Sequence, residues 1–326
     1  MPDAPLLAVQ HLRTVFPLHT GGDTAAVADV SFTLDRGRTL GLVGESGSGK
    51  SVTALSLIRL VQPPGRIAAG QIQFDGQDLM TLDEPAMRAI RGRRIGFVFQ
   101  EPMVALNPVF TIGQQIAETL TVHGLARGAA ARKKVVEWLA AVRMPNPAQR
   151  ADAYPHQLSG GLRQRAMIAL ALCAEPSLVI ADEPTTALDV TVQAEILDLL
   201  RELRREFGLA LLLITHDLGV VAEMADHVAV MYGGRIVEYG PVQTVFAGAA
   251  HPYTQGLLAC LPTLHTTARL QAIPGTVPSL GQFPAGCGFA TRCPHRFALC
   301  DTTPPPDIRC GEAHVAACYL HQEPAS

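Results

Sequence analysis

This sequence of 326 residues contains few lysines, a single tryptophan and no excess of basic over acidic residues. Only three of its 26 basic residues are lysines, so a lysine inside a motif carries more weight than usual. The 26 basic residues are balanced by 29 acidic ones, which gives a net charge of −3. Proteins that hold duplex nucleic acid by neutralising phosphates usually carry a basic excess. We therefore expect no nucleic-acid partner.

Long apolar runs are also missing. A membrane-spanning helix needs about 20 consecutive apolar residues, and the longest candidates here are Ala166–Ala174 and Leu209–Ile214. The chain begins Met1-Pro2-Asp3, without the basic and apolar stretches of a signal peptide. We therefore expect the chain to stay in the cytoplasm. Hydrophobic residues make up 48% of it, enough for a large core and about two domains.

The composition changes near residue 240. Residues 241–326 contain 11 of the 24 prolines and six of the seven cysteines. The first 240 residues alternate short β-branched runs with amphipathic stretches, which predicts an α/β fold. The predicted strands are Leu7–Val9, Val30–Thr33, Thr39–Val43, Gln71–Phe74, Arg94–Phe99, Leu178–Ala181, Ala210–Thr215 and His227–Tyr232. The predicted helices of a middle stretch, about residues 105–172, include Ile112–His123, Ala130–Val142 and Arg163–Cys173.

The strongest motif is a glycine-rich loop between the predicted strand Thr39–Val43 and a helical stretch, Ser51–Leu60. It fits the pattern G-x-x-x-x-G-K-[ST], in which glycines turn backbone N–H groups toward phosphate and the helix N-terminus adds a positive dipole end. Lys50 supplies a positive charge to the β- and γ-phosphates, and the Ser51 hydroxyl can ligate Mg²⁺. The predicted nucleotide-binding residues of this loop are Gly44, Glu45, Ser46, Gly47, Ser48, Gly49, Lys50, Ser51 and Val52.

Two adjacent carboxylates follow the predicted buried strand Leu178–Ala181. Ligands of open α/β sheets bind at the carboxyl ends of strands. We predict that Asp182 binds Mg²⁺ and that Glu183 polarises the attacking water as a general base. Strand alternation would point these two side chains to opposite faces and allow separate roles.

A third motif, Ser159-Gly160-Gly161, precedes a predicted helix and forms a second helix N-terminus that can hold phosphate. One nucleotide does not need two such sites in one chain. The second phosphate-binding site therefore suggests that this motif contacts a nucleotide bound on a partner chain. Standing alone, the motif would indicate only a capped helix with a flexible entry.

These motifs, with Gln100 after a strand, Ala187-Leu188-Asp189 and His216, occur in the order seen in ATP-binding cassette (ABC) subunits, which residues 7–240 resemble. The resemblance implies a P-loop NTPase ABC-type nucleotide-binding domain over residues 1–240. Its parts would be a RecA-like core, an antiparallel β-subdomain and a helical subdomain at about 105–172. A small Cys- and Pro-rich domain would follow in residues 241–326.

The same resemblance implies further roles. Gln100 would contact Mg²⁺ and the water, and His216 would contact the γ-phosphate. Ser159 and Gly161 would bind the γ-phosphate of the partner chain's ATP, and Asp189 would lie at the dimer interface. Phe16 is the best candidate for the aromatic that stacks on adenine, with a core phenylalanine as the alternative.

A narrower resemblance, to dipeptide and oligopeptide importer ATPases, rests on several short motifs, among them His251-Pro252-Tyr253-Thr254. It implies an ATP-hydrolysing subunit at the cytoplasmic face of the bacterial inner membrane. Its partners would be two transmembrane permeases, a second ABC ATPase, favoured as a paralogue, and an extracytoplasmic peptide-binding protein. Alternatives are an importer ATPase for nickel, glutathione or antimicrobial peptides, and a soluble ABC ATPase without a transport role.

Five cysteines crowd the C-terminal segment: Cys287, Cys293, Cys300, Cys310 and Cys318. None forms the C-x-x-C pair that zinc sites often use, and Pro294 follows Cys293 as in many cluster-binding sequences. The resemblance implies a [4Fe–4S] cluster on Cys287, Cys293, Cys300 and Cys318. Zinc and unliganded thiols are the alternatives, and the extra Cys310 leaves the fourth ligand open. His295 and His314 are predicted to be surface residues.

Overall fold

The computed structural model describes residues 4–18, 21–261 and 273–322, and its contacts divide the chain into two units. The first unit consists of residues 1–34, 39–80 and 214–326. The second consists of residues 35–38 and 81–213. The described residues contain no helix that is both long and apolar enough to cross a membrane.

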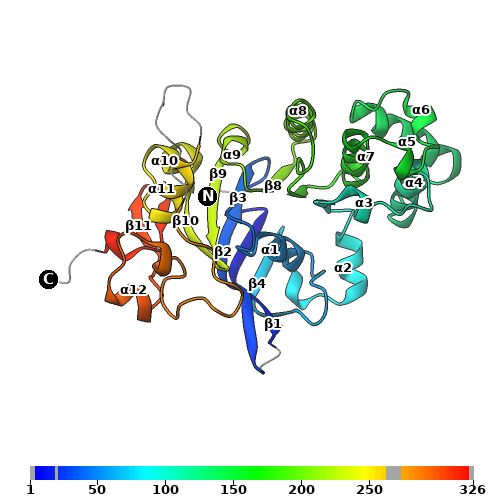
Figure 1. The fold of residues 1–326 in the computed structure, drawn as a ribbon. Coiled ribbons are helices and arrows are strands. Elements are labelled where there is room, and N and C mark those ends of the chain that lie inside the picture. Colours follow the sequence, from blue (N-terminus) through cyan, green and yellow to red (C-terminus); the bar gives the residue numbers. More distant parts are fainter. Residues whose placement is uncertain (1–3, 19–20, 262–272, 323–326) are drawn as a thin grey trace. The chain divides into compact units, whose positions relative to one another are not determined.

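The first unit is built on a sheet with strand order β5-β4-β1-β2-β10-β9-β3 (Figure 1). The strands are β1 (Leu7–Pro17), β2 (Asp23–Leu34), β3 (Thr39–Val43), β4 (Arg66–Phe74), β5 (Gln77–Asp78), β9 (His227–Tyr232) and β10 (Arg235–Pro241). Neighbours among β5, β4, β1 and β2 are antiparallel, whereas β3 and β9 run parallel. The expected antiparallel β-subdomain beside a parallel core is thereby confirmed.

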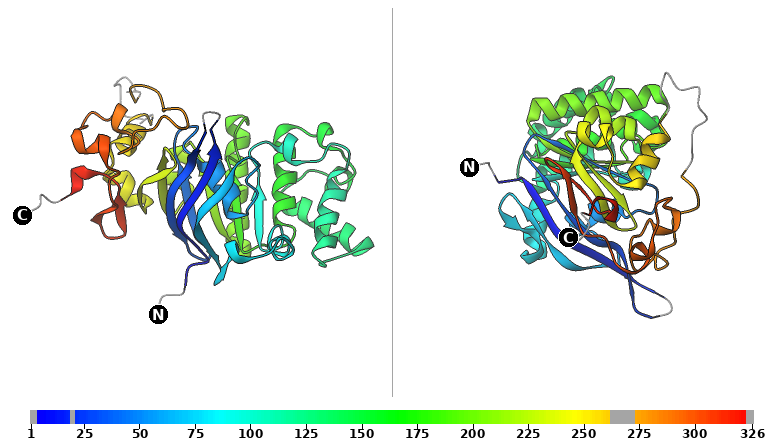
Figure 2. Two further views of the ribbon diagram at one scale, coloured as in Figure 1. Left: turned by 90° about the horizontal axis from the view of Figure 1, so that it is seen from below. Right: turned by 90° about the vertical axis from the view of Figure 1, so that its left-hand side faces the viewer.

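The C-terminal segment, residues 241–326, carries six of the seven cysteines and is part of this first unit. Its hairpin, β11 (Ile308–Gly311) and β12 (His314–Ala316), extends the sheet because β12 pairs with β10. Helices α10 (Val242–Ala247), α11 (Pro252–Ala259) and α12 (Ala298–Thr302) accompany it. Figure 2 shows the later part of this segment, in orange and red, beside its yellow helices α10 and α11.

A buried polar network ties the hairpin to β10. The Glu238 carboxylate accepts hydrogen bonds from the backbone N–H of Ala250 (2.7 Å) and of His251 (3.0 Å), and it lies 2.8 Å from His314 Nε2. His314 is therefore buried, and its prediction as a surface residue is wrong. The spacing of residues could not reveal this partner, which lies 76 positions away. His295 is exposed as predicted.

The second unit pairs β6 (Ile95–Val98) and β7 (Leu178–Asp182) in parallel, and β8 (Ala210–Thr215) follows β7 in the strand order. Its helices are α2 (Glu84–Ile90), α3 (Pro102–Ala105), α4 (Ile112–Val122), α5 (Gly128–Ala141), α6 (Pro147–Arg150), α7 (Gly160–Leu172) and α8 (Val190–Phe207). Helices α4, α5 and α7 pack against one another and form the expected helical region.

Candidate nucleotide-binding site

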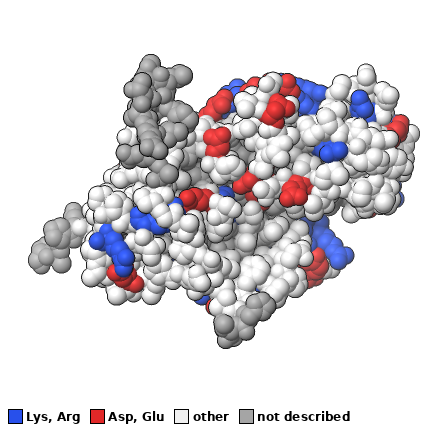
Figure 3. Space-filling model, in the orientation of Figure 1, with Lys and Arg blue, Asp and Glu red and all other residues white. Residues whose placement is uncertain are grey.

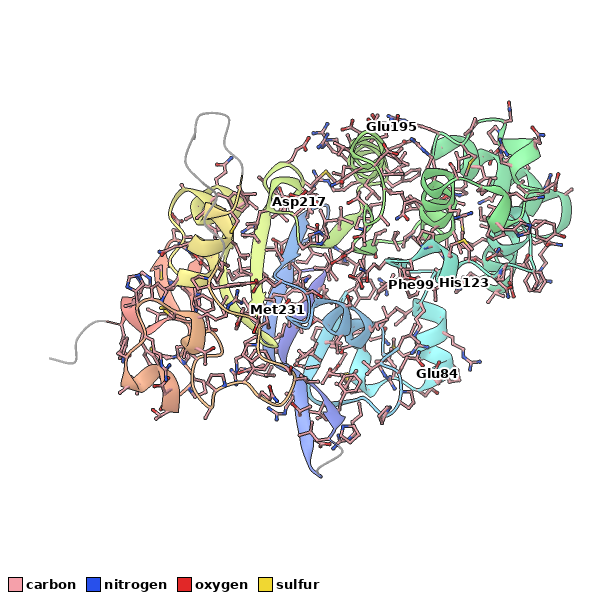
Figure 4. All side chains as sticks on the ribbon, in the orientation of Figure 1. Glu84, Phe99, His123, Glu195, Asp217 and Met231 are labelled. Carbon is pink, nitrogen blue, oxygen red and sulfur yellow. The ribbon has the colours of Figure 1, made fainter. Side chains whose placement is uncertain are left out.

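The glycine-rich loop joins β3 to α1 (Lys50–Leu57) in the first unit. A side chain at Gly44 would place its Cβ 2.2 Å from the carbonyl oxygen of Met231, and one at Gly49 would lie 2.4 Å from that of Ala26. Only glycine therefore fits at these two positions. Met231, labelled on β9 in Figure 4, lies against the loop, and its thioether accepts a hydrogen bond from the Thr53 hydroxyl of α1.

Lys50 begins α1 and is buried within the loop. Its Nζ donates hydrogen bonds to the carbonyl oxygens of Gly44 (2.7 Å) and Glu45 (3.0 Å). The backbone N–H of Ser48 closes a turn on the carbonyl of Glu45 (3.2 Å), and the Ser48 carbonyl accepts from Gly234. The lysine and the α1 N-terminus are thus held in one small region, as phosphate binding requires. Ser51 and Val52, half-buried, occupy the first turn of the helix.

Two residues that the sequence analysis did not assign also contact the loop. The hydroxyl of Tyr253, from α11, accepts a hydrogen bond from the backbone N–H of Glu45 at 2.8 Å. The guanidinium of Arg292, one residue before Cys293, donates two hydrogen bonds to the Glu45 carboxylate, at 2.6 and 3.1 Å. The motif containing Tyr253 was visible in the sequence, but nothing in its pattern indicated this partner.

The other predicted residues of the first unit are Phe16 and His216. Phe16 is half-buried near the end of β1, and its ring edge would lie 2.5 Å from a Cβ at Gly65, so the ring packs closely over that glycine. His216 is exposed directly after β8 and before α9 (Leu218–Met224). The neighbouring Asp217, labelled in Figure 4, caps α9 through the backbone N–H groups of Gly219 and Val220.

The hydrolytic candidates belong to the second unit. Asp182 ends β7 and is buried, whereas Glu183 lies beyond the strand with φ of 45°. Glu183 Oε2 accepts hydrogen bonds from Gln100 Nε2 (2.8 Å) and from the Thr186 hydroxyl (2.7 Å). The structure therefore places the side chains of Gln100 and Glu183 in direct contact.

Contrary to the prediction from the sequence, Asp182 and Glu183 do not alternate along one strand. Alternation applies to residues within a strand, and Glu183 is outside β7 in a left-handed conformation. The direction of its side chain is fixed by this turn and by the hydroxyl of Thr186. Left-handed φ is uncommon for residues other than glycine and often marks functional turns.

The Ser-Gly-Gly motif lies at the N-terminus of α7, where Ser159 is the N-cap and Gly160 the first helical residue. A Cβ at Gly161 would meet the Val192 side chain at 2.7 Å, and one at Gly160 would contact Leu188 at 3.5 Å. Asp189 caps α8 by accepting from the backbone N–H of Val192 at 3.0 Å. The motif and the segment containing Asp189 are therefore neighbours within the second unit.

Four of the C-terminal cysteines line one small cavity: Cys287, Cys293, Cys300 and Cys318. Cys310, on β11, is not among its lining residues. Burial raises the pKa of Cys287 to about 11, and it raises the pKa values of Cys293 and Cys318 as well. A metal ion or cluster would have to displace these thiol protons.

The cavity does not form a preorganised single-metal site. Within the described ranges, no group of three or more His, Cys, Asp or Glu side chains is arranged to hold a metal ion. Thiolates on one zinc ion, each about 2.3 Å from it, would have to lie within about 4 Å of one another. The expected [4Fe–4S] cluster therefore has no metal centre in the structure to support it and stays a prediction.

The loop, its buried lysine and the helix that follows define a P-loop nucleotide-binding protein. A profile of the ABC transporter family matches residues 27–186, and one of the oligopeptide/dipeptide transporter C-terminal region matches residues 237–300. The chain is 50% identical to a putative peptide import ATP-binding protein of Brucella ovis, over the full length of both. It is 47% identical to the dipeptide transport ATP-binding protein DppD of Bacillus subtilis, over 98% of this chain and 96% of DppD.

Solved structures give the same result. The ATP-binding cassette MJ0796, in a dimeric post-hydrolysis state bound to ADP and Pi, matches with a TM-score of 0.65 and 27% identity, over 72% of this chain and 98% of that one. CbiO1 of Clostridium perfringens matches with a TM-score of 0.64 and 28% identity, over 75% and 92%. The chain belongs to the family of ABC transporter ATP-binding proteins. The expected ABC-type fold and ATPase class are confirmed.

Proposed function

We propose that this chain hydrolyses ATP to power the import of dipeptides and oligopeptides through a membrane ABC transporter. The observation that carries the proposal is its end-to-end similarity to DppD, which includes the C-terminal region that the second family profile describes. A match limited to the cassette would have supported only a generic ABC ATPase. The face drawn in Figure 3, where both signs of charge are interspersed among uncharged residues, has no continuous basic surface.

In the proposed reaction, water attacks the γ-phosphorus of ATP in line with the leaving ADP. Glu183 takes the proton of this water, and its bond from Gln100 supports that role. Lys50 and His216 would stabilise charge on the γ-phosphate. Ser51, Asp182 and Gln100 would supply oxygen atoms, the kind of ligand that Mg²⁺ prefers. When bound, Mg²⁺ neutralises charge on the phosphates.

Binding would use two chains. Gly44 to Val52 hold the triphosphate of one nucleotide, and Phe16 stacks on its adenine. Ser159, Gly160 and Gly161 of the partner chain would complete the same site, with Asp189 at the interface. Dimeric MJ0796 with ADP and Pi supports such an assembly. The exposure of Ser159 and Gly160 at the α7 N-terminus leaves them accessible to phosphate from another chain.

The partners we propose are two permease subunits, a second and different ABC ATPase, and an extracytoplasmic peptide-binding protein. The chain would act at the cytoplasmic face of the inner membrane. We also propose the division into a nucleotide-binding domain, residues 1–240, and a C-terminal domain, residues 241–326. The pairing of β12 with β10 means that this second domain would share a sheet with the first.

We further propose that Cys287, Cys293, Cys300 and Cys318 hold a [4Fe–4S] cluster. Their convergence on one cavity, and the absence of Cys310 from its lining, support this ligand set. A cube-shaped cluster holds its thiolates farther apart than one metal ion does, which is compatible with the lack of a single-ion site among the described residues. Iron and sulfide analysis after anaerobic purification tests the proposal, and a colourless protein with little iron would overturn it.

Uptake by whole cells tests the transport function. A strain lacking this gene is supplied with wild-type protein or with Lys50→Ala, and uptake of a labelled dipeptide, nickel and glutathione is compared. We expect only the wild-type protein to restore dipeptide uptake, because the variant lacks the charge that the phosphates need. Restored uptake of nickel or glutathione alone would change the substrate class. Full uptake with Lys50→Ala would refute the ATP-driven role.

A further inference from the structure

The second residue of the phosphate-binding loop is held by the cysteine-bearing C-terminal segment. Two groups that lie far along the chain contact Glu45, one through its backbone and one through its carboxylate. Tyr253 accepts from its N–H at 2.8 Å, and Arg292 binds its carboxylate through both terminal nitrogens. Two-pronged pairing of this kind fixes orientation as well as charge. The position of Glu45 therefore depends on residues outside the conventional motifs.

Arg292 is rigidly placed. Its side chain is 4% exposed. Its Nε donates to the carbonyl of Pro274 at 2.9 Å, and its guanidinium lies 5.8 Å from the ring centres of Tyr232 and Phe289. A guanidinium stays protonated at any physiological pH. A cation buried to this degree requires an anion, and Glu45 supplies it.

Tyr253 is equally constrained. Its side chain is fully buried, with the ring centre 4.6 Å from that of Tyr232 and 5.3 Å from that of Phe289. Tyr232, Tyr253 and Phe289 therefore form one aromatic cluster behind the loop. Arg292 closes a short helical turn, Ala290–Arg292, between Cys287 and Cys293. The cysteine cavity and the phosphate loop are thus joined through a few consecutive residues.

The charge of Glu45 matters because the loop binds an anion. Its carbonyl oxygen accepts from Lys50 Nζ, so Glu45 belongs to the phosphate cradle itself. An unpaired carboxylate at this point would repel the triphosphate, whereas one neutralised by Arg292 does not. A unit charge within about 10 Å of another, at the effective dielectric of a protein surface, changes binding by roughly tenfold.

We propose that Arg292 and Tyr253 are positioning residues of the nucleotide site, through which the C-terminal segment sets the affinity of the P-loop for ATP. The inference rests on the proposed ATP-binding function and extends it to a second region of the chain. Arg292 neutralises and orients the Glu45 side chain, and Tyr253 fixes its backbone. Disturbing the segment around Cys287 and Cys293 then weakens nucleotide binding without altering any phosphate-contacting residue.

The test measures the dissociation constant for Mg-ATP, by calorimetry, with the full-length chain. We expect Arg292→Gln to weaken binding about tenfold, and to raise KM for ATP while kcat changes little. Arg296→Gln is the matched control: it breaks an exposed ion pair with Asp301 in the same segment without touching the loop, and affinity should stay within twofold of wild type. Equal affinity for wild type and Arg292→Gln would overturn the proposal.

A double variant separates charge neutralisation from a merely structural role. Glu45→Gln combined with Arg292→Gln is compared with Glu45→Gln alone, and because a glutamine at position 45 has no charge to neutralise, loss of Arg292 should then change affinity less than about threefold. If Arg292 served only to support the fold, Arg292→Gln would weaken binding by the same factor with and without the Glu45 charge, and the proposal would fail. A wild-type chain that binds no Mg-ATP would instead refute the proposed function itself.

Tyr253→Phe keeps the test decisive if Arg292→Gln does not fold. This change removes only the hydroxyl that accepts from Glu45 N–H, and we expect binding weaker by roughly fivefold, the value of one hydrogen bond. Tyr319→Phe, which removes a hydroxyl bonded to Thr303 and Pro304 in the same segment, is its control. Equal affinity for Tyr253→Phe and the control would contradict the role of Tyr253.

Discussion

The two halves of the nucleotide machinery are held in different ways. In the first unit, close contacts fix parts of the phosphate loop: Gly44 and Gly49 abut backbone oxygens, Lys50 is buried, and Arg292 pairs with Glu45. In the second unit, the proposed base Glu183 lies beyond the end of its strand and accepts two side-chain hydrogen bonds. Binding thus relies on a rigid cradle, whereas the proposed base relies on a few replaceable contacts.

The rigid cradle should be the less tolerant half. Gly44→Ala would place a methyl group 2.2 Å from the Met231 carbonyl oxygen, so we expect a loss of about 3 kcal/mol or more in the free energy of unfolding, together with loss of ATP binding. Gly47→Ala, where nothing lies within 4 Å, is the control and should cost about 1–2 kcal/mol through its positive φ. Urea unfolding measures both, and equal losses would contradict a close-packed loop.

The hydrolytic half should lose catalysis while keeping binding. Glu183→Gln removes the proposed base, so we expect turnover to fall at least about 100-fold with the dissociation constant for Mg-ATP unchanged. Phosphate release assays and calorimetry measure the two quantities. Near-normal turnover would refute the assignment of Glu183, and lost binding would show that the two halves are not separable.

Orientation of the base should have a smaller effect. Thr186→Val removes one hydrogen bond to Glu183 Oε2, and a bond to a charged group of this kind is worth roughly tenfold in turnover. Thr186→Ser restores the hydroxyl and should recover most of the rate. If valine and serine behaved alike, the hydroxyl would have no part in positioning Glu183.

The smallest effect concerns pH and the C-terminal segment. Burial lowers the pKa of His251 to about 3, so the folded protein keeps it neutral while the unfolded chain protonates near pH 6.5. Its stabilising contribution is complete above pH 6.5 and is lost as the pH falls below that value. Between pH 7.5 and 6.0 the loss is about 0.8 kcal/mol. His251→Asn keeps a side chain able to accept a hydrogen bond from the Tyr253 N–H. The free energy of unfolding of this variant, measured at both pH values, should lack the loss of about 0.8 kcal/mol. A pH dependence unaffected by His251→Asn would mean that burial of this imidazole does not determine it.

Local signals predicted much of the fold. Strands β3, β8 and β9 have the predicted bounds because each is a short apolar run between turn signals. Strand β1 continues to Pro17, eight residues past its predicted end at Val9, because register shifts interrupt its alternation. Strands β11 and β12 were missed, since their pairing with β10 depends on contacts across about 76 positions.

The part of the candidate site that consists of consecutive residues could be predicted from the sequence. Gly44 to Ser51 are such a motif, and the structure places them in a strand–loop–helix unit. The pairing of Glu45 with Arg292 was not predictable, because 247 positions separate the two residues and no sequence motif contains both. The position of Glu183 directly after a buried strand was predicted, but its left-handed backbone has no signature in the sequence.

The distance between Glu45 and Arg292 also has a consequence for synthesis. A ribosome adds about 5–20 residues per second, so the arginine is made roughly 12–50 s after the glutamate that it neutralises. During that interval a nascent cassette already has its glycine-rich loop but lacks its counter-ion. Under the role proposed for Arg292, a nascent chain would reach its full affinity for nucleotide only after residue 292 has been translated.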